Sequence, residues 1–275
     1  MKKKTAKALK LLVICLICIM CLIPFYILLV LSLNDPGRVF YEGNIFVPSF
    51  NIHNYADAWI KSKIGRAMIN SAIITAGTLG LTIVTGGLAG YAIARHGSIM
   101  NKTIFSVILG CMMIPGIINT VPLYMIMKRI KAVNTLWGMI LVCSALAMPS
   151  AVFIFTTFIG AQPKELDEAA AIDGCNGMKI FWKIIFPIIK PATASFIILN
   201  GFGIWNNYAQ AVFFLQSSKK HNIPQALSVF FQQFAGAKWH LMAATAVIAV
   251  IPVVIVFQIF QKQFVKGLTD GAIKG

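Results

Sequence analysis

Amide side chains recur at helical spacing in the apolar segment 192–215. Asn200, Gly203, Asn207 and Gln210 fall at positions i, i+3, i+7 and i+10, which places them on one face of a continuous helix. An amide buried in hydrocarbon costs free energy unless it is hydrogen-bonded. Because amides both donate and accept hydrogen bonds, they also suit a solute that is rich in hydroxyl groups. We therefore expect this face to line a polar pathway.

The same segment contains Trp205, whose ring could stack on such a solute, and the neighbouring Asn206. Asn119 adds a polar group to another apolar segment, 103–127. The alternative is that the amides join neighbouring helices by hydrogen bonds, a common use of Asn and Gln in membranes. The spacing leaves both interpretations open. The candidate pathway residues are Asn119, Asn200, Trp205, Asn206, Asn207 and Gln210.

A cluster of charge between residues 162 and 191 predicts two short helices. Four of the chain's eight acidic residues occur in its first part, namely Glu165, Asp167, Glu168 and Asp173. Acidic side chains suit the positive end of a helix, and Pro163 can be its first residue. Gly174 can adopt the left-handed conformation that ends it. A second helix is predicted over 176–185, ending before Pro187.

These two clusters lie in a strongly apolar chain. Of its 275 residues, 58% are hydrophobic and 12% are charged, whereas soluble domains have about half and about a quarter. A membrane span needs ~20 predominantly apolar residues, which leaves room for about six spans. We predict an all-α polytopic membrane protein, a single transmembrane domain over 1–275, with spans at 11–33, 67–94, 103–127, 135–159, 192–215 and 241–262.

Two spans carry further signals. Pro115, Gly116 and Pro122 should break the third span, which a membrane helix tolerates where the freed carbonyls find partners. In the second span, small residues recur every four positions and should let another helix approach closely. This stripe consists of Thr82, Gly86, Gly90 and Ala94.

The basic residues indicate orientation. The net charge is +16, but Lys and Arg are scattered among apolar runs and form no continuous face for nucleic acid. The lysines of residues 1–10 precede the first span and predict a cytoplasmic N-terminus. The run 11–33 is longer than a signal-peptide core and has no clean small-residue cleavage site after it.

The motif content argues against catalysis. The sequence contains no Gly-x4-Gly-Lys-Ser/Thr loop that could cradle a nucleotide phosphate. Cys15, Cys18 and Cys21 are surrounded by aliphatic residues, so we interpret them as small apolar fillers rather than metal ligands. We therefore expect no catalytic residues, no metal site and no cofactor.

The stretch EAAAIDG, residues 168–174, followed by Ile184 and Pro187, resembles the EAA motif of permease subunits of bacterial ABC importers. With Phe181, Lys190 and Pro191 added, the pattern is similar to the carbohydrate-uptake branch of that family. The end of the chain, 263–275, resembles its closing motif. Trp205-Asn206 is similar to a Trp-Asn position of sugar permeases, although Asn207 stands where an acidic residue often follows.

The resemblance implies that 160–191 is a cytoplasmic coupling loop between the fourth and fifth spans, which docks in a groove on a separate ATPase. The coupling residues that it implies are Glu168, Ala169, Ala170, Asp173, Gly174 and Pro187. Leu166, Ala169 and Ala170 fall at i, i+3 and i+4 and should form a small apolar docking patch.

The implied function is ATP-driven import of a sugar or related polyhydroxylated solute by alternating access. The implied partners are a second homologous permease subunit, two cytoplasmic ATPase subunits and an extracytoplasmic solute-binding protein, around a multi-pass chain in the lipid of the cell membrane, with both termini cytoplasmic. An ABC permease for a non-sugar solute remains an alternative. A stand-alone secondary transporter or channel is another; it would predict charges within the spans or a repeated half, but all eight acidic residues lie in predicted loops.

Overall fold

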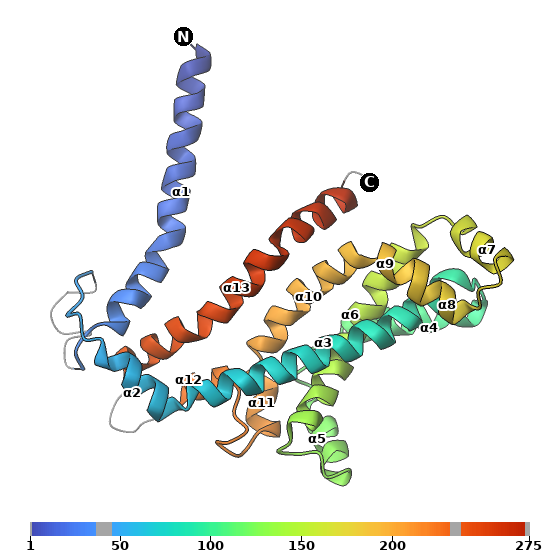
Figure 1. Cartoon of the computed structure of the whole chain (residues 1–275). Helices are drawn as coiled ribbons and strands as arrows, with labels where there is room; N and C mark the ends of the chain where they lie inside the picture. The colour runs from blue at the N-terminus through green and yellow to red at the C-terminus, as the bar shows by residue number, and fades with distance from the viewer. Residues whose placement is uncertain (1, 37–45, 232–237, 273–275) are drawn as a thin grey trace. The chain divides into compact units, whose positions relative to one another are not determined.

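The computed structural model describes residues 2–36, 46–231 and 238–272, and every regular element within these ranges is helical (Figure 1). Parts of two predicted outer segments, 37–45 and 232–237, and the last residues of the closing motif, 273–275, lie outside the described residues. In chain order the elements are α1 (Lys2–Ser32), α2 (His53–Ser62), α3 (Ile64–Arg95), α4 (Ile99–Met112), α5 (Thr120–Arg129), α6 (Leu136–Gly160), α7 (Glu165–Ile172), α8 (Gly177–Ile180), the π-helical turn η1 (Phe181–Ile185), α9 (Phe186–Ile188), α10 (Lys190–Trp205), α11 (Ala209–Phe214), α12 (Ile223–Ser228) and α13 (Trp239–Ala272).

Four helices of the described part are long and apolar enough to cross a membrane. They are Leu9–Ser32 within α1, the whole of α3 and α6, and Trp239–Ile259 within α13. A fifth candidate is the bent pair Gly177–Ile188 and Lys190–Trp205, whose axes differ by 71°. The predicted third span corresponds to α4 and α5, which are separated at residues 113–119. The break predicted from Pro115 and Gly116 is therefore confirmed, whereas Pro122 lies inside α5 and does not break the helix as predicted.

The predicted fifth span, 192–215, is not one continuous helix, because α10 ends at Trp205 and α11 begins at Ala209. Between them, Oδ1 of Asn207 accepts a 3.0 Å hydrogen bond from the backbone N–H of Gln210. Such a local side-chain bond competes with helix continuation and favours a new helix start. The prediction that Asn200 and Gln210 share one helical face was therefore wrong.

The chain divides into two compact units. Unit 1 comprises Met1–Gly65 and Gln225–Pro252, and unit 2 comprises Arg66–Pro224 and Val253–Gly275. Unit 2 contains the candidate site described below.

In unit 1, buried polar groups join the end of α1 to the start of α2. The amide nitrogen of Asn54 donates to the carbonyl oxygens of Ser32 at 3.0 Å and of Asn34 at 2.8 Å. The hydroxyl oxygens of Ser32 and Tyr55 lie 2.7 Å apart. Because an unpaired buried amide is costly, these bonds fix the turn between the two helices.

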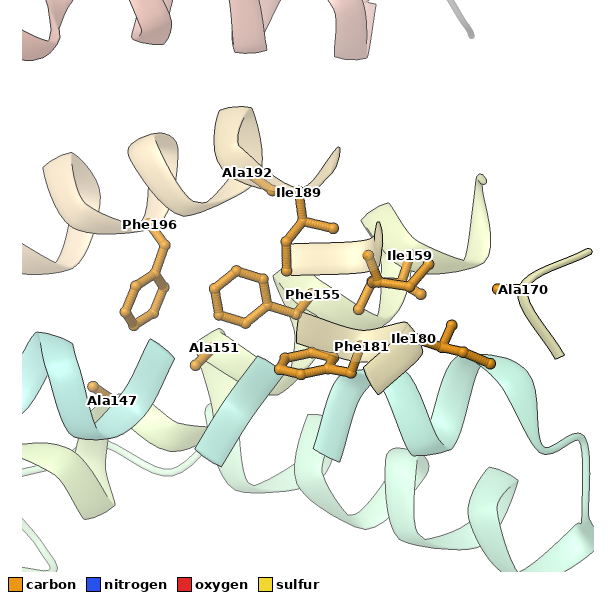
Figure 2. Close-up of a cluster of buried hydrophobic side chains, with 11 residues drawn as sticks. Ala147, Ala151, Phe155, Ile159, Ala170, Ile180, Phe181, Ile189, Ala192 and Phe196 are labelled. Carbon is orange, nitrogen blue, oxygen red and sulfur yellow. The ribbon is translucent and has the colours of Figure 1, made fainter. Parts of the chain in front are cut away.

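The main core of unit 2 lies where α6, η1 and α10 meet (Figure 2). Phe155, Phe181 and Phe196 are fully buried there. The rings of Phe155 and Phe196 point toward one another, with centroids 5.7 Å apart, so they tie α6 to α10. Aromatic rings at this separation attract each other beyond their burial alone.

Helix α3 packs on α6 through the predicted stripe of small residues. A Cβ added to Gly86 would lie 2.7 Å from the Cβ of Ala151. One added to Gly90 would lie 2.9 Å from both the Cβ of Phe155 and the backbone nitrogen of Thr156. No larger residue fits this approach without moving a helix, so the predicted packing role of the stripe is confirmed.

Candidate functional site

The charged loop after α6 folds into α7, whose first turn contains Glu165, Asp167 and Glu168. The helix begins at Glu165, so Pro163 precedes it and is not its first residue as predicted. Gly174 ends the turn with φ +79°, and its N–H donates to the carbonyl oxygen of Ala171 at 3.0 Å. The predicted left-handed helix end is confirmed.

A second helical run follows and extends beyond its predicted end. Asn176 caps it, since its side chain accepts a 2.9 Å hydrogen bond from the N–H of Lys179. The run continues as α8, η1 and α9 through Pro187 to Ile188. The reason is the π-helical turn η1, in which the N–H of Phe186 reaches back five residues to the carbonyl of Phe181. Such a turn relaxes the backbone next to a proline.

Helix α7 has an inner and an outer side. Ala170 is 5% exposed and belongs to the same core cluster as Ile180 (Figure 2). Ala170 is therefore not part of an exposed docking patch, in contrast to our expectation. The outer side carries Ile172, which is 87% exposed, and the exposed residues Glu168, Ala169 and Asp173. Ile172 is not among the coupling residues predicted from the sequence, although it lies four positions after Glu168 in the predicted helix.

A buried ion pair fixes the inner side of α7 to the last turn of α3. Nη2 of Arg95 lies 2.9 Å from Oδ2 of Asp167, and the two side chains are 7% and 16% exposed. Nη1 of Arg95 also donates to the carbonyl oxygen of Gln162 at 3.0 Å. The hydroxyl of Tyr91 donates to Oδ1 of Asp167 at 2.7 Å. No local sequence pattern predicts this network, because its members come from separate predicted elements.

Tyr91 also contacts the second short helix. The centroid of its ring lies 5.7 Å from that of Phe181. Phe181 is fully buried. The Cζ atom of its ring would lie 3.3 Å from a Cβ added to Gly87 of α3. The end of α3 therefore contacts both halves of the loop.

A cavity of about 560 Å³ lies within unit 2. Its wall includes the break between α4 and α5, the part of α6 around Pro149, and Asn200 of α10. The polar side chains that face it are Asn119, Ser150 and Asn200. The structure thus brings together two of the six candidate pathway residues, Asn119 and Asn200, with a serine that the sequence did not single out.

The other four candidates, Trp205, Asn206, Asn207 and Gln210, do not line this cavity. Gln210 is buried, and its amide accepts from the Thr120 hydroxyl at 3.0 Å and donates to the Gly116 carbonyl at 3.3 Å. The amide nitrogen of Asn207 lies 3.7 Å from Sγ of Cys143. These bonds join α11 and the residues before it to the α4–α5 break and to α6.

Among the described residues, no group of three His, Cys, Asp or Glu side chains is arranged to hold a metal ion.

Comparisons with known proteins agree with this architecture. Residues 82–270 match the family described as "Binding-protein-dependent transport system inner membrane component". The chain is 41% identical over 255 residues to the melibiose/raffinose/stachyose import permease protein MelC of Bacillus subtilis (strain 168), covering 92% of this chain and 91% of MelC. It is 34% identical over 206 residues to the arabinooligosaccharides transport system permease protein AraQ of Halalkalibacterium halodurans, covering 75% and 73%.

The fold is similar to that of a chain of a bacterial ABC transporter involved in the import of the acidic polysaccharide alginate. The TM-score is 0.80 at 18% identity, over 95% of this chain and 97% of that one. At this identity the similarity concerns the fold alone.

The family match covers more than half of the chain, and several of its helices are apolar enough to span a membrane. The chain therefore belongs to the binding-protein-dependent transport system inner membrane component family, and it is a multi-pass membrane permease of the ABC-importer type rather than an enzyme.

Proposed function

We propose that the chain is one of two permease subunits of an ATP-driven importer that moves a sugar, or a related polyhydroxylated solute, into the cytoplasm. The observation that carries the proposal is α7, a short helix between α6 and α10 that has one exposed side and is followed by the left-handed Gly174. The sugar class is supported by the relatives MelC and AraQ, which are named for oligosaccharides.

The proposed topology has six spans. Helices α4 and α5 together form the third span, and α10 with α11 forms the fifth. Both termini and the loop of α7–α9 then lie on the cytoplasmic side. The lysine-rich residues 1–10 support this orientation, because basic residues before a first span favour retention in the cytoplasm.

The outer side of α7 is the proposed docking surface for a cytoplasmic ATPase. Ile172 and Ala169 offer apolar contact, and Glu168 and Asp173 flank them. A complementary groove would have apolar walls and basic groups at its rim, and such rim charges tune specificity more than affinity. Ala170 supports this surface from inside. Gly174 and Pro187 set the directions of the two helical runs.

The proposed partners are a second, similar permease subunit, two ATPase subunits and an extracytoplasmic solute-binding protein. The binding protein is in keeping with the name of the family. Separate ATPase subunits are in keeping with a sequence in which we find no phosphate-cradling Gly-x4-Gly-Lys-Ser/Thr motif.

The proposed solute pathway passes the cavity that Asn119, Ser150 and Asn200 line. Amide and hydroxyl groups can donate to and accept from the hydroxyls of a sugar. Trp205 and Asn206 extend the proposed pathway, whereas Asn207 and Gln210 hold its walls together through the bonds described above.

The test is affinity purification of this chain from its native membranes, with Ala169→Trp compared with Ala169→Ser. We expect an ATPase to co-purify with the unchanged chain and with Ala169→Ser, and to be lost with Ala169→Trp because the indole fills the docking groove. Equal ATPase recovery with both variants would contradict the docking surface. Uphill uptake by the chain alone, driven by an ion gradient, would support a secondary transporter instead.

A further inference from the structure

The last turn of α3 holds the loop, although α3 and α7 are far apart in the sequence. The guanidinium of Arg95 binds a carbonyl just before α7 and a carboxylate in the first turn of α7. If the loop were connected only by the polypeptide backbone, its movement would pass to α6 and α10 alone, the helices that precede and follow it. The contacts of Arg95 and Tyr91 attach it to a third helix as well.

The two helix ends that meet here are electrostatically complementary. A helix carries partial negative charge at its C-terminus and partial positive charge at its N-terminus. Arg95 is the last residue of α3, and Asp167 lies in the first turn of α7. The ion pair is largely removed from water, and such a pair is favourable only in a narrow range of geometries. It therefore holds α7 in one orientation.

Helix α3 also packs against α6 next to the residues of α6 that line the cavity. Gly86 packs against Ala151 of α6 with no room for a side chain. Ala151 follows Ser150, which lines the cavity. The contacts thus run from Asp167 through the end of α3 to α6 and the cavity.

We propose that Tyr91, Arg95 and Asp167 form a clamp that transmits movement of α7 to α3 and the adjoining face of α6. The proposal rests on the proposed function, since it requires an ATPase that moves α7. The three are positioning residues: they act through α7 and α3 and touch neither nucleotide nor solute.

The test uses the complete importer reconstituted in vesicles and measures solute uptake per ATP hydrolysed. Arg95→Gln with Asp167→Asn removes both charges and leaves no buried charge unpaired. We expect this double variant to assemble and hydrolyse ATP, with uptake per ATP reduced about fivefold or more, the usual size of coupling between sites. Tyr91→Phe, which keeps the ring on Phe181, should reduce the same ratio. Lys102→Gln, at an exposed position, is the matched control and should leave it unchanged.

An unchanged ratio in the double variant and in Tyr91→Phe would overturn the clamp, because a purely structural role does not alter the ratio in complexes that assemble. If the double variant does not assemble, Tyr91→Phe decides the question, since it removes one hydroxyl only. The two proposals fail differently: if no ATPase associates with the unchanged chain, the proposed function is wrong, whereas normal coupling in the variants contradicts the clamp alone.

Discussion

The hydroxyl of Ser150 lies 3.0 Å from Oδ1 of Asn200, a contact between α6 and α10 at the wall of the cavity, and 2.9 Å from the carbonyl oxygen of Ala147 in its own helix, so its one proton is shared between the two acceptors. The amide nitrogen of Asn200 makes a longer bond, 3.4 Å, to the carbonyl oxygen of Phe196 in its own helix. A weak bond of this length is easily exchanged for a better partner. In the proposed pathway, the amide nitrogen of Asn200 would donate to a solute while its oxygen contacts the Ser150 hydroxyl.

We expect Asn200→Leu to weaken solute handling without loss of the assembled complex. Removing one hydrogen bond of about 0.5–1.5 kcal/mol should raise the apparent KM for uptake by about twofold to tenfold. The measurement is the concentration dependence of uptake in vesicles. Ser195→Ala is the control, because its hydroxyl bonds to the carbonyl of Pro191 within the same helix. An unchanged KM in Asn200→Leu would remove Asn200 from the pathway.

Gln210→Leu should act on stability instead. Gln210 is 5% exposed, and its loss leaves the Thr120 hydroxyl and the Gly116 carbonyl without this partner. An unsatisfied buried group costs about 1–3 kcal/mol. The thermal unfolding midpoint of the solubilised complex should fall, and uptake should fall in proportion to the amount of folded complex. A normal midpoint with selective loss of uptake would instead assign Gln210 to the pathway.

Local features could be predicted from the sequence, and long-range contacts could not. Gly174 marks its own left-handed turn, and Pro115 with Gly116 marks the break between α4 and α5. The inner side of α7 is set by Tyr91, which lies 76 residues from Asp167. No local pattern identifies that partner, so Ala170 was assigned to the exposed side. The Asn206–Asn207 pair was a usable signal for the end of α10, because Asn side chains compete for backbone bonds.

Gly174→Ala should impair coupling through the backbone alone. A Cβ at Gly174 meets no atom within 4 Å, but φ is +79°, and a left-handed conformation costs a non-glycine residue about 1–2 kcal/mol. We expect less ATPase to co-purify and uptake to fall. Gly177→Ala is a matched control, since its Cβ also meets nothing within 4 Å and its φ is not positive. Equal effects of the two variants would argue against the left-handed turn as the cause.

The contact of α3 with α6 can be tested at Gly90. In Gly90→Ala the new Cβ would lie 2.9 Å from the Cβ of Phe155 and from the backbone nitrogen of Thr156. A backbone atom cannot move aside as a flexible side chain can, so α3 must shift away from α6. Overpacking of this kind costs about 1–3 kcal/mol. Gly80→Ala on the same helix is the control, because a Cβ there meets nothing within 4 Å.

We expect Gly90→Ala to lower the thermal midpoint of the complex and, in the fraction that remains assembled, to reduce uptake per ATP hydrolysed. The second effect follows because a shifted α3 still holds α7 through Arg95 but no longer fits the face of α6 beside the cavity. If the midpoint falls while uptake per ATP stays at the level of Gly80→Ala, then the close approach of the two helices serves stability only. In that case the clamp must act through another contact of α3.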